Sequence, residues 1–113
     1  MATFPQQLST ERLEKELRSF YSEVNKEIKN KLGEYQRQSN AGASGENMSE
    51  IRYNNRHLQD VFRKLEQGQE KVQIQWYEPQ VERTSPPKVS MQKRSFQLEH
   101  RYGKWIKHTH DLR

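Results

Sequence analysis

The sequence predicts an all-α protein in which two amphipathic helices precede an irregular, extended C-terminal segment. Three observations lead to this fold class: apolar residues at helical spacing over about residues 9–38, a second such stripe over about 47–69, and three prolines within 78–90. The expected organisation is an extended lead-in (1–8), a two-helix interaction region (9–70) with a flexible loop (39–46), an extended proline-punctuated linker (71–92) and a basic aromatic tail (93–113).

The first predicted helix begins after Ser9, whose hydroxyl is suited to accept a hydrogen bond from a free backbone N–H of the first turn. Leu8 and Leu13 occupy the two positions of a hydrophobic staple. At about 100° per residue the apolar side chains fall within an arc of roughly 120°, and Glu–Lys and Glu–Arg pairs spaced i,i+4 lie opposite. The stripe consists of Leu13, Leu17, Phe20, Tyr21, Val24, Ile28, Leu32 and Tyr35.

The second predicted helix begins at Asn47, with Glu50 three positions on as in other N-terminal caps. Its apolar residues follow a near-heptad seam that also contains Asn54. Either this asparagine sets register or partner number from inside the seam, or it lies at the seam edge and contacts water. The helices form an antiparallel hairpin or coiled coil, or act as separate arms, and the sequence leaves these alternatives open.

The last third of the chain lacks a helical period. Val72, Ile74 and Trp76 alternate with two glutamines, which predicts a short strand or an extended segment. From Lys93 to Arg113 aromatic and aliphatic residues are interleaved with Lys and Arg, in a pattern that fits neither period well. We therefore expect a short helix or an extended ribbon there.

The chain is poor in apolar material. Only 30% of its residues are hydrophobic and 31% are charged, whereas globular domains contain about 45–50% apolar residues. Such a chain is expected to complete its core on a helical partner protein in a larger complex, and to be partly unfolded alone. The residues predicted to bind that partner are Leu17, Val24, Ile28, Leu58, Val61 and Leu65.

The positive charge is concentrated at the C-terminal end. Residues 71–113 hold nine Lys/Arg against four Asp/Glu, which equals the net charge of +5 of the whole chain. This asymmetry favours an acidic partner, which is an acidic protein surface such as that of tubulin, a nucleic acid, or anionic lipid. The alternative is that the tail is solvated and binds no partner. The tail residues expected to contact the partner are Phe96, Tyr102, Lys104, Trp105 and Lys107.

Catalytic and metal-binding patterns are missing from the sequence. No cysteine is present, and no phosphate-binding loop, nucleophile motif or paired metal-ligand motif occurs. His108 and His110 resemble two metal ligands, but a site needs three or four, so we predict neither a metal nor a cofactor. The sequence thus favours a protein that is not an enzyme.

Two further features bear on regulation and location. Ser85 opens a Ser-Pro-Pro-Lys sequence in an extended segment, which makes it a candidate for proline-directed phosphorylation. The chain has no membrane-spanning run of about 18 apolar residues, and residues 1–5 lack the pattern of a signal peptide. We therefore expect a cytoplasmic protein, associated with the cytoskeleton, or a nuclear one.

Taken as a sequence, the chain predicts a structural or adaptor subunit linked to microtubules. The alternative is a nucleic-acid-associated factor that uses the basic tail.

Overall fold

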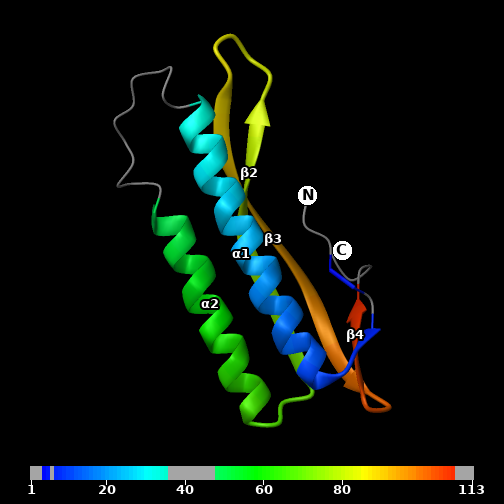
Figure 1. Cartoon of the computed structure of the whole chain (residues 1–113). Helices are drawn as coiled ribbons and strands as arrows, with labels where there is room; N and C mark the ends of the chain where they lie inside the picture. The colour runs from blue at the N-terminus through cyan, green and yellow to red at the C-terminus, as the bar shows by residue number, and fades with distance from the viewer. Residues whose placement is uncertain (1–3, 6, 36–47, 109–113) are drawn as a thin grey trace.

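Two helices pack against one face of a four-stranded antiparallel sheet (Figure 1). The structure is a computed structural model that describes residues 4–5, 7–35 and 48–108. The strands lie in the order β1-β4-β3-β2, so that β1 and β2 form the two edges of the sheet. The elements along the chain are β1 (Gln7–Leu8), α1 (Thr10–Tyr35), α2 (Met48–Glu66), β2 (Lys71–Glu82), β3 (Lys88–Arg101) and β4 (Lys104–His108).

The all-α prediction is wrong, because the residues expected to be irregular build most of the sheet. The long hairpin of β2 and β3 includes the residues of the predicted linker (71–92). β3 and β4 include most of the described residues of the predicted tail. The prolines do not prevent this arrangement. Pro79 lies on the edge strand β2, where a missing N–H is tolerated, while Pro86 and Pro87 lie in the turn between β2 and β3.

The two predicted helices are present, and the start of α1 has the predicted cap. The Ser9 hydroxyl accepts a hydrogen bond from the backbone N–H of Arg12 at 3.3 Å, and the Ser9 carbonyl accepts one from Leu13 at 2.8 Å. Leu8 and Leu13 are both buried, as the hydrophobic staple requires. The predicted cap at Asn47, the loop 39–46 and the extension of the first helix to residue 38 lie outside the described residues.

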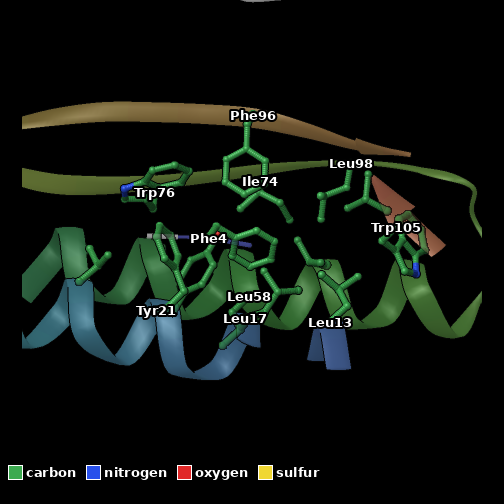
Figure 2. Packing of buried hydrophobic residues seen from close by; sticks show 14 of the residues in the cluster. Phe4, Leu13, Leu17, Tyr21, Leu58, Ile74, Trp76, Phe96, Leu98 and Trp105 are labelled. Atoms are coloured by element: carbon green, nitrogen blue, oxygen red, sulfur yellow. The ribbon is translucent and has the colours of Figure 1, made fainter. Parts of the chain in front are cut away.

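The apolar stripes of both helices face the chain's own sheet (Figure 2). Phe4, which precedes β1, joins this core, with its ring centroid 5.9 Å from that of Phe20 and 5.2 Å from that of Phe96. The sparse apolar residues are thus gathered into one core between sheet and helices. The sheet contributes Leu8, Val72, Ile74, Trp76, Phe96, Leu98 and Trp105.

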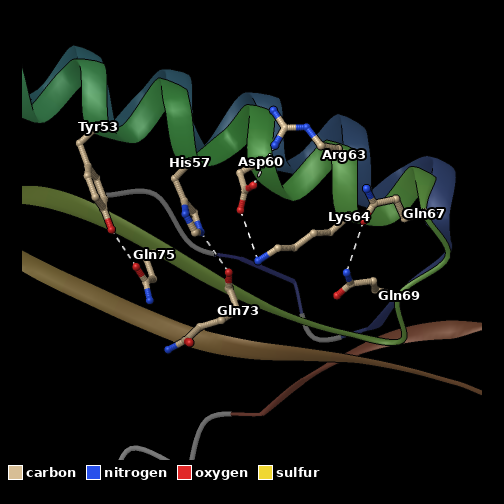
Figure 3. A network of polar contacts seen from close by, with 9 residues as sticks. All are labelled: Tyr53, His57, Asp60, Arg63, Lys64, Gln67, Gln69, Gln73 and Gln75. Carbon is tan, nitrogen blue, oxygen red and sulfur yellow. Dashed lines mark hydrogen bonds and ion pairs between the residues drawn. The ribbon is translucent and has the colours of Figure 1, made fainter.

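Polar side chains from the helices close the exposed edge of β2. The fully buried Asn54 side chain accepts a hydrogen bond from the Tyr77 N–H at 2.8 Å and donates to the Tyr77 carbonyl at 3.1 Å. The hydroxyl of Tyr21 donates to the Gln75 carbonyl at 2.6 Å, and desolvation of that phenol raises its pKa well above the ordinary value. His57 Nε2 lies 3.0 Å from the carbonyl of Gln73 (Figure 3). An edge whose backbone groups are occupied in this way is protected against pairing with another strand.

The long β2–β3 hairpin twists so strongly that its buried side changes along its length. Register is unbroken from Lys71↔Glu99 to Glu82↔Lys88. Near the base of β2 the even-numbered residues Val72, Ile74 and Trp76 are buried, whereas toward the tip the odd-numbered residues 77, 79 and 81 are the more buried ones. The two strands cross in Figure 1, as this right-handed twist requires.

Candidate interaction surface at the turn between β3 and β4

The turn that joins β3 to β4 presents an aromatic side chain to solvent. Tyr102 is 92% exposed and is the only large hydrophobic side chain so exposed in the described part of the chain. Its φ is 55°, and Gly103 follows with a φ of 75°. Two successive residues with positive φ between antiparallel strands match the two-residue hairpin turn that Asn-Gly usually occupies.

Tyrosine is a costly residue at this position. The left-handed conformation costs an L-residue roughly 1–2 kcal/mol, and asparagine and glycine tolerate it best. Because the ring is exposed, burial of its apolar surface does not offset that cost. Local strain of this kind is concentrated at binding sites, so the turn is a candidate for one.

Two cations flank Tyr102. Lys104 is exposed on the far side of the turn, and Arg101 is exposed on the near side. The Arg101 Nε lies 3.1 Å from Glu99 Oε2, and the other oxygen of that carboxylate lies 2.9 Å from His108 Nε2. Both carboxylate oxygens of Glu99 are therefore bound. The turn presents the phenol of Tyr102 between the side chains of Arg101 and Lys104.

The electrostatic surroundings of Glu99 favour its ionised form. Desolvation acts to raise the pKa of this carboxyl group, but the hydrogen bond with His108 and the interactions with Arg101 and Lys71 outweigh it and lower the pKa below its ordinary value. A carboxyl group whose pKa is lower in the folded state stabilises the fold above its unfolded pKa, and that stability is lost as the pH falls through the folded pKa.

We therefore expect Glu99→Gln to flatten the acid side of the stability–pH curve. Above about pH 5 the variant should be less stable than the wild type, and the difference should disappear well below the ordinary glutamate pKa of about 4.3. Urea unfolding followed by circular dichroism at a series of pH values measures this. A difference that persists unchanged at acid pH would contradict the assignment.

Most residues predicted to bind a partner lie in the core. Leu17, Val24, Ile28, Leu58 and Val61 are buried between helices and sheet, and Leu65 is half-buried against them. The structure therefore places these side chains against the chain's own strands. None of these six predicted partner-binding residues is exposed on the surface of a helix.

The predicted tail residues are divided between core and surface. Phe96 and Trp105 are only 5% and 4% exposed, and the indole N–H of Trp105 donates to Thr10 Oγ1 at 3.0 Å. Lys107 Nζ lies 4.6 Å from the centroid of the Phe96 ring, and partial desolvation lowers the pKa of this amine. Of the five predicted tail contacts, only Tyr102 and Lys104 remain exposed.

Ser85 lies in the exposed turn between β2 and β3. The neighbouring Thr84 hydroxyl donates to the Pro86 carbonyl at 2.6 Å, which holds the turn locally. The proposed phosphorylation of Ser85 stays a prediction.

Of the two histidines compared with metal ligands, His108 binds Glu99 and His110 lies outside the described residues. Within residues 4–5, 7–35 and 48–108, no three His, Cys, Asp or Glu side chains are grouped as metal ligands would be. The described helices also include none that is long and apolar enough to span a membrane.

Sequence reasoning missed Arg101 and the cations of the β2–β3 hairpin as surface features. The signal for the turn was present, because an aromatic residue followed by glycine between two basic residues interrupts the tail at Gly103. Without strands on either side, that glycine does not indicate a hairpin turn.

A second cluster that the sequence did not predict lies on β2, β3 and α2. There, Lys93 Nζ is 5.0 Å from the Tyr53 ring centroid and 6.0 Å from that of Tyr77.

Comparison with known proteins gives no relative: no protein-family model, curated protein or solved structure matches the chain.

Proposed function

We propose that the protein is a non-enzymatic adaptor subunit that binds an acidic surface of a partner protein through the turn between β3 and β4. Tyr102 is the anchor, and Arg101 and Lys104 flank it. The observation that carries this proposal is the conformational cost of Tyr102, which is almost fully exposed in a left-handed backbone conformation where asparagine would be more stable. A residue that costs stability, and whose ring no described residue covers, is best explained by a contact made with a partner.

The chemistry of the turn favours a protein partner. Tyrosine and arginine are enriched among the residues that dominate protein–protein binding energies, because they combine apolar contact area with hydrogen bonding. The flanking cations favour an acidic site and speed association with it. Tubulin-type surfaces have this acidic character, so a microtubule-linked assembly is the partner we propose to test first.

The decisive experiment is Tyr102→Asn, for which stability and binding should change in opposite directions. Asparagine suits the turn, so the variant should be more stable by about 0.5–1 kcal/mol in urea unfolding. Loss of an aromatic anchor commonly costs about 2 kcal/mol or more of binding energy, so affinity for polymerised tubulin in co-sedimentation should fall at least tenfold.

Tyr102→Phe is the matched control, because it keeps both the ring and the strained turn. Its affinity should stay within about threefold of the wild type, since the exposed ring edge and the cations are retained. If Tyr102→Asn binds as well as the wild type, the turn is not the docking site. If the wild type binds tubulin equally before and after proteolytic removal of the acidic tubulin tails, the acidic surface is not what it recognises.

A further inference from the structure

The two edges of the β2–β3 hairpin differ in how their backbone groups are used. On the β2 edge, the Asn54 side chain binds both the N–H and the carbonyl of Tyr77. Tyr77 lies directly opposite Lys93 in β3. In an antiparallel pair, a residue whose backbone groups point away from the partner strand lies opposite a residue whose groups also point away. The N–H and carbonyl of Lys93 are therefore directed to the far edge of β3.

That edge of β3 is open from Val89 to Ser95. Backbone direction alternates along a strand, so the groups of Val89, Met91 and Ser95 point the same way as those of Lys93. β4 pairs with β3 only from Gln97 onward. Among the described residues, no strand or loop binds the backbone of this run on that side. The run, called the open β3 edge below, is roughly 20 Å long.

The usual protection of a free strand edge is missing here. Such edges are commonly guarded by proline, by a bulge or by charged side chains. Residues 88–96 contain no proline, and their register with β2 is unbroken. The side chains of Lys93 and Arg94 extend over β2 instead, where the Lys93 amine lies 5.0 Å from the ring centroid of Tyr53 and Arg94 binds Glu78 at 2.9 Å. Neither cation therefore guards the open β3 edge.

The flank of α1 away from α2 is acidic. Asn25 bonds to Asn54 and Asn55 of α2, so it marks the side of α1 that faces α2. Glu23 and Glu27 are each two residues from Asn25, which places them about 200° around the helix, on the opposite side. Neither carboxylate forms an ion pair with a described residue. This acidic flank of α1 is directed toward β3 and β4, because α2 lies on the other side of α1 (Figure 1).

The acidic flank and the open β3 edge are at the same level of the molecule. Asn54 binds both Asn25 of α1 and Tyr77 of β2, and Tyr77 lies opposite Lys93. The acidic flank therefore runs alongside the middle of the open edge. A strand added to β3 there presents every second side chain to the helix layer, where Lys or Arg suits the two glutamates.

We propose that the open β3 edge binds an extended, basic segment of a second partner protein, which joins the sheet in line with β4. Backbone hydrogen bonds to the run from Val89 to Ser95 attach the segment, and its alternate Lys or Arg side chains give specificity through Glu23 and Glu27. A second copy of this chain suits the edge less well, because two-fold pairing brings the two acidic flanks together on one face of the sheet, where like charges repel. This proposal goes beyond the adaptor function and rests on residues other than those of the Tyr102 turn.

The probe is a fluorescently labelled peptide of about eight residues in which lysine and valine alternate, and its binding to the full chain is measured by anisotropy. Two N-methylated forms of the peptide are blocked at the lysine amides or at the valine amides, so each has lost the donors of one edge. We expect one form to bind about tenfold more weakly or worse and the other to bind like the parent, because only one edge of the peptide faces β3.

A matched pair of variants tests the backbone of the chain. Lys93→Pro removes the central N–H of the open β3 edge, and proline is tolerated where its missing N–H faces the free side of an edge strand. Lys93→Ala removes the same side chain but keeps the N–H. The proline variant should bind the peptide about tenfold more weakly, and the alanine variant should stay within about twofold of the wild type. Circular dichroism checks folding, and if Lys93→Pro does not fold, the N-methylated peptides still decide the question on the wild type.

A second pair tests the acidic flank. Glu23→Gln with Glu27→Gln should weaken binding of the lysine–valine peptide about fivefold at roughly 0.1 M salt. Glu11→Gln with Glu66→Gln also removes two exposed negative charges from the helices, and should stay within about twofold of the wild type. A peptide with glutamate in place of lysine should bind at least as weakly to the wild type as the lysine peptide binds to the first variant.

Amide hydrogen exchange followed by NMR locates the contact. The odd-numbered amides from Val89 to Ser95 should exchange quickly in the free chain and slowly with peptide, whereas the even-numbered amides between them are protected in both states by β2. Tyr102→Asn should leave peptide binding unchanged, so failure of this proposal is distinguishable from failure of the adaptor proposal.

Several outcomes contradict the proposal. One is that both N-methylated peptides bind like the parent, and another is that the glutamate peptide binds as tightly as the lysine peptide. Protection of the odd-numbered amides that rises with protein concentration in the chain alone assigns the open β3 edge to a second copy. Protection of the same amides at every concentration assigns the edge to another segment of this chain.

Discussion

Asn54→Ala is expected to destabilise the protein by about 3 kcal/mol, a large effect for a polar residue. Asn54 is fully buried and its side chain satisfies three groups: the N–H and carbonyl of Tyr77, and the side-chain oxygen of Asn25 at 2.9 Å. Alanine leaves the two backbone groups of Tyr77 at the edge of β2, and the Asn25 oxygen on α1, without this partner. Each unsatisfied buried polar group costs roughly 1–3 kcal/mol, and the cavity adds to this unless water enters it. Urea unfolding of the purified chain measures the change.

Asn55→Ala is the matched control one residue away. Asn55 is exposed, and its side-chain oxygen accepts a hydrogen bond from Asn25 at 2.9 Å. Loss of that exposed contact should cost about 0.5–1 kcal/mol. Similar costs for Asn54→Ala and Asn55→Ala would show that the edge of β2 does not depend on the buried amide.

This asparagine also shows how an ambiguous pattern in the sequence is resolved by the fold. The near-heptad spacing placed Asn54 inside an apolar seam and left open whether it is buried or touches water. It is buried, and its partners are mainly the backbone of a strand 23 residues further along the chain. Since helix–helix contact was the expected packing, the sequence offered no reason to look for a strand edge.

The helices were predictable because their signals are local. A serine cap, a hydrophobic staple and apolar residues at i, i+3 and i+4 spacing depend only on neighbouring residues. The long hairpin was not predictable in this way. Its alternation is clear over Val72, Ile74 and Trp76, but the twist moves the more buried positions to odd-numbered residues from Tyr77 onward. In this strand the alternation of more and less buried residues shifts by one position in the middle, and Pro79 follows just after the shift. In the sequence such a strand resembles an irregular segment.

The candidate site was predicted only in part, because composition does not separate anchors from core. Phe96, Tyr102 and Trp105 are all aromatic residues interleaved with Lys and Arg, so the sequence does not distinguish them. Strand pairing decides between them: Phe96 lies opposite Ile74 on the core side, and Trp105 lies opposite His100. Tyr102 alone lies in a turn, where no strand neighbour or helix covers it.

Trp105→Ala is therefore expected to unfold or severely destabilise the protein, with a loss of about 3–5 kcal/mol in the free energy of unfolding. Trp105 is 4% exposed, its ring lies 5.0 Å from that of His100, and its indole N–H donates to Thr10 at the start of α1. The residue thus connects β4 to the first turn of the helix. Since small domains are stable by only about 5–15 kcal/mol, this loss is a large share of the total.

Two further variants separate the contributions of Trp105. Trp105→Phe keeps most of the apolar contact but loses the hydrogen bond to Thr10, and should cost about 1–2 kcal/mol. Tyr102→Asn, three residues earlier in the same hairpin, should instead be stabilising. If Trp105→Ala unfolds at the same urea concentration as the wild type, Trp105 is not part of the core. The changes in the free energy of unfolding expected for Trp105→Ala and Tyr102→Asn have opposite signs because of where the two residues lie. Trp105 fills space between the sheet and the helix, whereas Tyr102 extends into solvent at a strained turn.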